Sequence, residues 1–158
     1  MKLILLKISS LIVLAGFIFF VLYAREPKRV EKSVLEDTVA AAADDGECEK
    51  ATSKDLKRLY GLNEADYDYA ILYQPVSNMD VTEVLIVSLK DEAQKETVKE
   101  AAETRLETQK KNFDGYGTDQ LETLKSAVIY AEGCYVCYFA GESAKDTFSA
   151  FKKTVEVR

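Results

Sequence analysis

The sequence predicts an α+β domain with a four-stranded, largely antiparallel sheet and packed helices, preceded by one transmembrane helix. Three observations support this prediction. Residues 8–24 form an uncharged apolar run with lysines and arginines on both sides. Residues 51–158 alternate between short β-branched or aromatic runs and longer amphipathic runs. Their predicted order, helix–strand–strand–helix–helix–strand–strand–helix, places two strand–strand–helix units in succession, which is typical of an antiparallel sheet covered by helices.

The first 24 residues are predicted to be a membrane anchor. The run from Ile8 to Ala24 just spans a hydrocarbon core of roughly 30 Å at about 1.5 Å per helical residue. A cleaved signal peptide is the alternative, but Leu22–Ala24 places a large tyrosine inside the candidate cleavage site. Phe17 stands where a lipoprotein signal would have its cysteine, so acylation there is impossible.

The orientation of this anchor is open from the sequence alone. Two lysines precede the run and four basic residues follow it, namely Arg25, Lys28, Arg29 and Lys32. The excess of basic residues after the run predicts a cytoplasmic C-terminal side. The N-terminal tail is very short and signal-like, which favours an extracytoplasmic domain instead.

Residues 25–50 are predicted to be a charged linker, within which Val30 to Ala43 could continue as a helix from the membrane. The acidic cluster at 44–47 lacks the alternating oxygen ligands of a calcium loop, so no metal site is predicted. Residues 1–32 contain six basic and two acidic residues, a net charge of +4. The whole chain has a net charge of −6, so residues 33–158 have a net charge of −10. Such an acidic domain disfavours nucleic acid binding, which needs a basic face.

Local patterns predict the elements of residues 51–158. Ser53 caps a first helix, which Gly61 ends. The predicted strands are Tyr67–Gln74, Glu83–Leu89, Ala127–Ala131 and Tyr135–Ala140, and the later helices are Asp91–Phe113, Asp119–Lys125 and Ser143–Val155. The central strands are apolar on both faces, whereas a sheet exposed on one side alternates apolar with polar residues. We therefore expect the domain's own helices to cover both faces, with a partner covering one face as the alternative.

The candidate binding surface combines an aromatic strand face with nearby polar residues. Its members are Tyr67, Tyr69, Tyr73, Asn78, Asp80, Arg105, Gln109 and Tyr116. The three strand tyrosines are predicted to share one face, either as a stacking platform for a glycan or peptide or as half-buried sheet residues. Arg105 and Gln109 lie one helical turn apart and could bind a ligand or satisfy loop carbonyls.

The residue inventory predicts no catalytic residue, cofactor or metal ligand. The chain has no histidine, which removes the usual catalytic triads and most zinc sites. Cys134 and Cys137 match a Cys-x-x-Cys motif, but in a strand their side chains point to opposite faces, so we expect two small apolar side chains. Cys48 in the linker could cross-link two copies in an oxidising compartment.

Several residues together resemble the bacterial domain of unknown function 4358 family. They are Leu59-Tyr60-Gly61, then Arg105, Gln109, Phe113 and Tyr116, then Leu124 with Ala127, and Gly133 with Tyr135-Val136. The resemblance covers about residues 50–155, and it implies an extracytoplasmic domain because many members look like small envelope lipoproteins. Phe17 departs from that pattern and leaves a protein anchor. The resemblance implies no activity, substrate or catalytic residue.

We therefore expect an uncharacterised membrane-anchored extracytoplasmic module that binds or scaffolds a partner at the bacterial cell envelope and is not an enzyme. Residues 8–24 would hold it in the cell membrane, and the partner would be an envelope protein or a second copy. One alternative is a small hydrolase-type enzyme that uses carboxylates and lysine. Another is a cytoplasm-facing regulatory subunit of a membrane complex.

Overall fold

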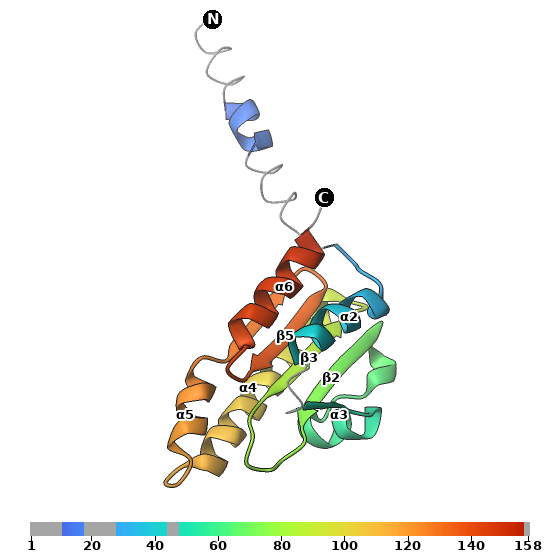
Figure 1. Ribbon diagram of the computed structural model, residues 1–158. Coiled ribbons are helices and arrows are strands. Elements are labelled where there is room, and N and C mark those ends of the chain that lie inside the picture. Colours follow the sequence, from blue (N-terminus) through green and yellow to red (C-terminus); the bar gives the residue numbers. More distant parts are fainter. Residues whose placement is uncertain (1–10, 18–27, 44–47, 157–158) are drawn as a thin grey trace, which may run out of the picture.

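The structure, a computed structural model, describes residues 11–17, 28–43 and 48–156. Its centre is a five-stranded antiparallel sheet in the order β1-β2-β3-β5-β4 (Figure 1). The strands are β1 (Cys48–Lys50), β2 (Tyr69–Pro75), β3 (Glu83–Ser88), β4 (Val128–Glu132) and β5 (Tyr135–Ala140). The α+β class and the antiparallel pairing are thus confirmed.

The predicted number of four strands is wrong, because β1 adds a fifth. Cys48, Glu49 and Lys50 pair with Pro75, Gln74 and Tyr73 along the outer edge of β2. Their composition carries no strand pattern, and two of the three side chains are exposed. This segment is a strand because its backbone pairs with β2, and the sequence of these three residues does not indicate that pairing.

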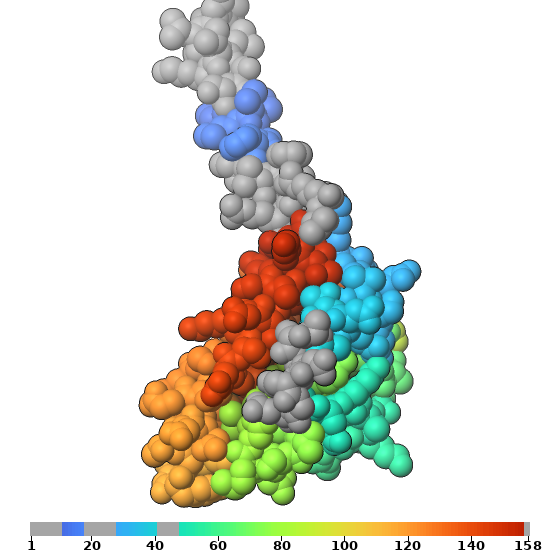
Figure 2. Space-filling view, viewed as in Figure 1, coloured from blue at the N-terminus to red at the C-terminus, as the bar shows by residue number. Residues whose placement is uncertain are grey.

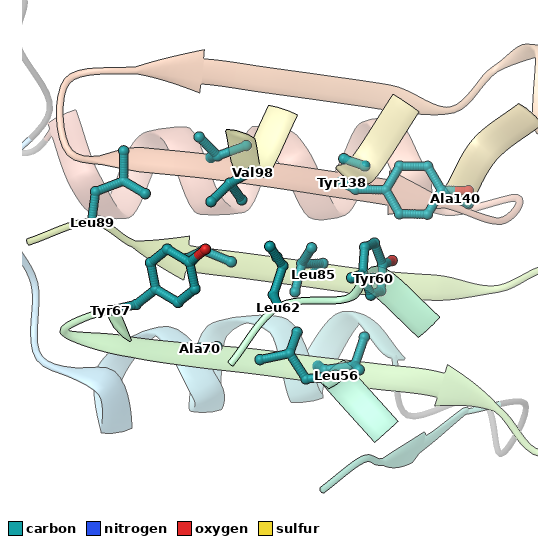
Figure 3. Packing of buried hydrophobic residues seen from close by; sticks show 14 of the residues in the cluster. Leu56, Tyr60, Leu62, Tyr67, Ala70, Leu85, Leu89, Val98, Tyr138 and Ala140 are labelled. Carbon is teal, nitrogen blue, oxygen red and sulfur yellow. The ribbon is translucent and has the colours of Figure 1, made fainter. Parts of the chain in front are cut away.

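Helices cover both faces of the sheet, as the apolar central strands predicted. Helices α3 (Ser53–Tyr60), α4 (Lys95–Phe113) and α5 (Thr118–Lys125) lie over one face, and α2 (Lys32–Ala43) and α6 (Ala144–Glu156) lie over the other. Each face therefore has its own apolar core. Figure 3 shows part of the first core, where side chains of α3, α4 and the sheet meet.

Helix α2 lies inside the segment predicted as a linker. Its Leu35 and Val39 are fully buried in the second core, against side chains of the sheet and of α6. Residues 28–31 before it are not helical, so α2 does not continue an unbroken helix from the N-terminal run. The predicted linker therefore supplies both a helix and a strand to the fold.

The N-terminus of α3 is capped one residue earlier than predicted. Thr52, not Ser53, is the N-cap, and it forms a capping box with Asp55. Arg58 and Thr52 both bond the Asp55 carboxylate and lower its pKa to about 2. Gly61 ends the helix as predicted, in the left-handed conformation at φ 71° that glycine adopts without strain.

Only residues 11–17 of the predicted anchor fall within the described residues. They are helical, and their large apolar side chains are more than half exposed. In the described stretches no helix has both the length and the apolar character needed to cross a bilayer. The rest of the predicted anchor lies outside these stretches.

Candidate functional site

The most concentrated polar chemistry in the described residues is a buried cluster around Glu83. Glu83 opens β3, and its side chain is 0 % exposed. Arg105 donates to it through Nε (3.1 and 3.2 Å to the two carboxylate oxygens) and through Nη2 (2.6 Å to Oε2). Gln109 donates from Nε2 to Oε2 at 3.2 Å, and the Tyr60 hydroxyl donates to Oε1.

The elements around the cluster explain why these residues meet. Arg105 and Gln109 lie one turn apart on the sheet-facing side of α4, and Tyr60 ends α3. Tyr138 on β5 donates its hydroxyl to Gln109 Oε1 at 2.5 Å and completes the network. Tyr60 and Tyr138 lie among apolar side chains between the sheet and its helices (Figure 3). The cluster therefore joins α3 and α4 to β3 and β5 inside the first core.

The electrostatics of the cluster are those of a closed structural network. Burial and the nearby charge of Glu83 raise the pKa values of Tyr60 and Tyr138. Burial lowers the pKa of Arg105, but the hydrogen bond and charge of Glu83 outweigh it, and the net shift is upward. Donors already contact both oxygens of the Glu83 carboxylate, which no solvent reaches. This arrangement holds helices on the sheet.

Arg105 and Gln109 thus bond a carboxylate and a tyrosine hydroxyl, and not the loop carbonyls that the sequence suggested. The sequence prediction missed Glu83 entirely, although one signal was present. Glu83 is a single acid directly before the apolar run Val84–Val87, at a position where the strand is buried on both faces. A charged residue in that setting requires a buried partner, and Arg105 was already a candidate.

The three strand tyrosines do not form an exposed platform. Tyr67 precedes β2 and is buried in the first core, whereas Tyr69 and Tyr73 pack on the second core, so the prediction of one shared face is wrong. The Tyr69 hydroxyl donates to Val30 O at 2.6 Å and lies 3.2 Å from the Tyr135 hydroxyl. Burial is the main cause that raises the pKa values of Tyr69 and Tyr73.

The remaining candidates lie together at one end of the sheet, which we call the loop pole: residues 76–82, residues 114–117 and α5. Figure 2 shows the β2–β3 loop in green beside α5 in orange at this end. Gln120 Nε2 donates to Met79 O at 3.1 Å and joins the two parts. Val76, Met79 and Tyr116 are 62 %, 57 % and 66 % exposed there. Asn78 is also exposed.

Asp80 has a structural role in the loop pole. Its Oδ1 accepts hydrogen bonds from Val81 N, Thr82 N and Thr82 Oγ1, and it thereby shapes the entry into β3.

A hollow of about 350 Å³ lies between α4 and α5, lined by Lys110, Thr118, Leu121, Glu122 and Lys125. Val76, Met79 and Tyr116 do not line this hollow, so the exposed apolar side chains alone make this end a surface that a protein could contact.

Cys134 and Cys137 both pack on the second core, so the prediction that their side chains point to opposite faces is wrong. Cys137 is buried in β5 and Cys134 lies in the turn before it, with no disulfide between them. Burial raises the pKa of Cys137 well above its usual value, which disfavours the reactive thiolate. Cys48 donates to Thr82 O at 3.1 Å. Among residues 11–17, 28–43 and 48–156, no group of three or more Cys, Asp or Glu side chains is placed to hold a metal ion.

Comparison with known proteins gives one family. The model of a family described as Domain of unknown function (DUF4358) matches residues 41–141, which is more than half of the chain and runs from the end of α2 to just beyond β5. No curated protein and no solved structure matches the chain. The match includes Glu83, Arg105, Gln109 and Tyr138, and the chain belongs to the domain of unknown function 4358 family.

Proposed function

We propose that this protein is a membrane-anchored, extracytoplasmic module that binds or scaffolds a partner at the cell envelope through its loop pole. The observation that carries the proposal is the contrast between the two candidate sites. The carboxylate at the centre of the polar cluster is fully buried and already hydrogen-bonded, whereas the loop pole exposes Val76, Met79 and Tyr116. Large apolar side chains exposed at one end of a domain are candidates for contact with another protein.

The apolar residues at 11–17 support the anchor. They are helical, and among the described residues their large apolar side chains remain more than half exposed. Leaving such a surface in water is unfavourable by about 25 cal/mol for each Å² of apolar area, so an apolar environment must take it up. A lipid bilayer fits the uncharged run 8–24 and its basic flanks.

Topology is the first test. A C-terminal epitope tag is followed while protease is added to intact protoplasts, with lysed protoplasts as the control. Loss of the tag from intact protoplasts is expected for an extracytoplasmic domain. Survival of the tag until lysis would contradict the proposal and favour a cytoplasm-facing regulatory subunit instead.

The binding surface is tested by photo-crosslinking in cells. A photo-reactive amino acid replaces Tyr116 at the loop pole or, as the matched control, Glu100, which is exposed on α4 away from that end. We expect one discrete adduct from position 116 and none from position 100. Met79→Ser should weaken the adduct, because Met79 belongs to the same surface. Equal labelling at both positions would contradict binding by the loop pole.

A further inference from the structure

Residues 28–30, which we call the strap, are hydrogen-bonded to the folded domain. Val30 N donates to the Tyr135 hydroxyl at 2.8 Å, and Val30 O accepts from the Tyr69 hydroxyl at 2.6 Å. Both polar groups of one backbone residue are therefore held by side chains of two different strands. The Val30 side chain also packs against the second core.

The other two strap residues also form bonds with distant parts of the domain. Lys28 N donates to Val155 O at 3.1 Å, which joins the strap to the last turn of α6. Arg29 donates from Nη2 to Leu89 O at 2.7 Å and forms an ion pair with Asp68. Each residue of the strap thus has at least one bond to a distant part of the domain.

These contacts define one end of the molecule, the strap end. Leu89 N donates to Cys134 O at 2.8 Å, so the turn between β4 and β5 belongs to the same end. In Figure 1 residues 28–31 and the end of α6 lie opposite the β2–β3 loop and α5. Helix α4 runs from the strap end to the loop pole, and its 19 residues measure about 28 Å at 1.5 Å per residue.

The distance from the strap to the apolar run is short. Only Arg25, Glu26 and Pro27 separate Ala24 from Lys28, which limits the gap to about 14 Å even for a fully extended chain. The headgroup region adds only roughly 5–8 Å beyond each side of the hydrocarbon core. We propose that the strap clamps the domain onto the lipid headgroup layer, strap end towards the membrane, so that the loop pole stands about 30 Å away from the bilayer.

This proposal rests on the proposed anchor and deepens it, because it names the surface that meets lipid. Electrostatic attraction does not supply the clamp. Arg29 is paired with Asp68, and Lys32 Nζ lies 3.1 Å from Glu64 Oε1. Residues 33–158 carry a net charge of −10, which anionic lipids repel. Chain length and the bonds of the strap therefore fix the orientation, and anionic lipid has little influence on it.

The test measures the height of each end above the bilayer. Full-length protein is reconstituted into phosphatidylcholine vesicles, with or without phosphatidylglycerol, that carry an energy-transfer acceptor on their headgroups. A donor dye is attached through an encoded azide at Glu132, exposed at the strap end, or at Met79, exposed at the loop pole. We expect several-fold stronger transfer from position 132 than from position 79, with both lipid mixtures alike.

A variant with a longer connection before Lys28 tests whether the short connection, and not adhesion of the domain to lipid, sets the orientation. An insertion of about twelve glycine and serine residues before Lys28 leaves the strap intact but adds roughly 20 Å of flexible reach. The contrast between positions 132 and 79 should then largely disappear. Equal transfer in the original chain, or a contrast that survives the insertion, would overturn the clamp while the anchor stands. Protein that fails to float with the vesicles would overturn the anchor and the clamp together.

Discussion

Replacing Arg105 by methionine tests whether the buried cluster holds α4 on the sheet. The change removes all three Arg105 hydrogen bonds to Glu83 and leaves that fully buried carboxylate with Tyr60 and Gln109 only. Removing one partner of a buried ion pair costs about 3–5 kcal/mol. A domain of ordinary stability has about 5–15 kcal/mol in total. We therefore expect Arg105→Met to remove at least a fifth of the free energy of unfolding.

The assay is urea unfolding of the full-length protein in detergent. The chain has nine tyrosines and no tryptophan, so tyrosine fluorescence and far-ultraviolet circular dichroism report the transition. Lys99→Met is the matched control, because Lys99 is on the same helix and pairs with Glu96 at 3.3 Å in an exposed position. Exposed pairs contribute about 0–1 kcal/mol, so the control should stay close to the original chain.

The pair can also be removed as a whole. Glu83→Leu combined with Arg105→Met leaves no uncompensated charge, so the double variant should be more stable than the sum of the two single losses predicts.

If Arg105→Met loses no more free energy of unfolding than Lys99→Met does, the reasoning is refuted. Such a result would mean that water reaches the Glu83 carboxylate in the folded protein.

Three further predictions concern local features of the fold, each measured by the same unfolding assay. Thr52→Ala removes the N-cap of α3 and should cost about 1 kcal/mol; an unchanged midpoint would show that the cap is dispensable. Tyr60 and Tyr138 have raised pKa values in the folded protein, so both the folded and the unfolded chain keep these phenol protons below pH about 10. Above that pH the unfolded state releases them first, and stability should fall by about 1.4 kcal/mol per pH unit for each tyrosine, with a shallower slope in Tyr60→Phe. Gly141→Ala should cost more than about 1 kcal/mol, since φ is 118° and the new Cβ would lie 2.9 Å from Thr82 Cγ2; a neutral result would require that loop to move freely.

The elements that the sequence predicted well are those with a regular local pattern. The strands Glu83–Ser88 and Tyr135–Ala140 and the long helix to Phe113 lie within a few residues of their predicted bounds. Both faces of the central strands are apolar over four or more residues, and that pattern correctly indicated two helical layers. Periodicity is a property of neighbouring residues, so it is visible in the chain itself.

The candidate site was harder to predict, because its partners are far apart in the chain. Arg105 and Gln109 stood out by their place on a helix, but Glu83 is 22 residues from Arg105 and was counted only as the start of a strand. The tyrosines of β2 looked like an exposed row, whereas Tyr69 is covered by Val30, which lies in the predicted linker 39 residues away. Neither contact could be inferred from spacing.

By itself the sequence determined the order of the main elements in residues 51–158, the two apolar faces of the sheet, the apolar N-terminal run and the lack of any histidine chemistry. Only the tertiary structure decided that Cys48–Lys50 is a strand, that Glu83 is the acid which Arg105 binds, and that residues 28–30 belong to the domain. The physical reason is the range of the interactions. Helix caps and periodicity act within a few residues, whereas strand register and buried ion pairs depend on which distant segments the folded chain brings together.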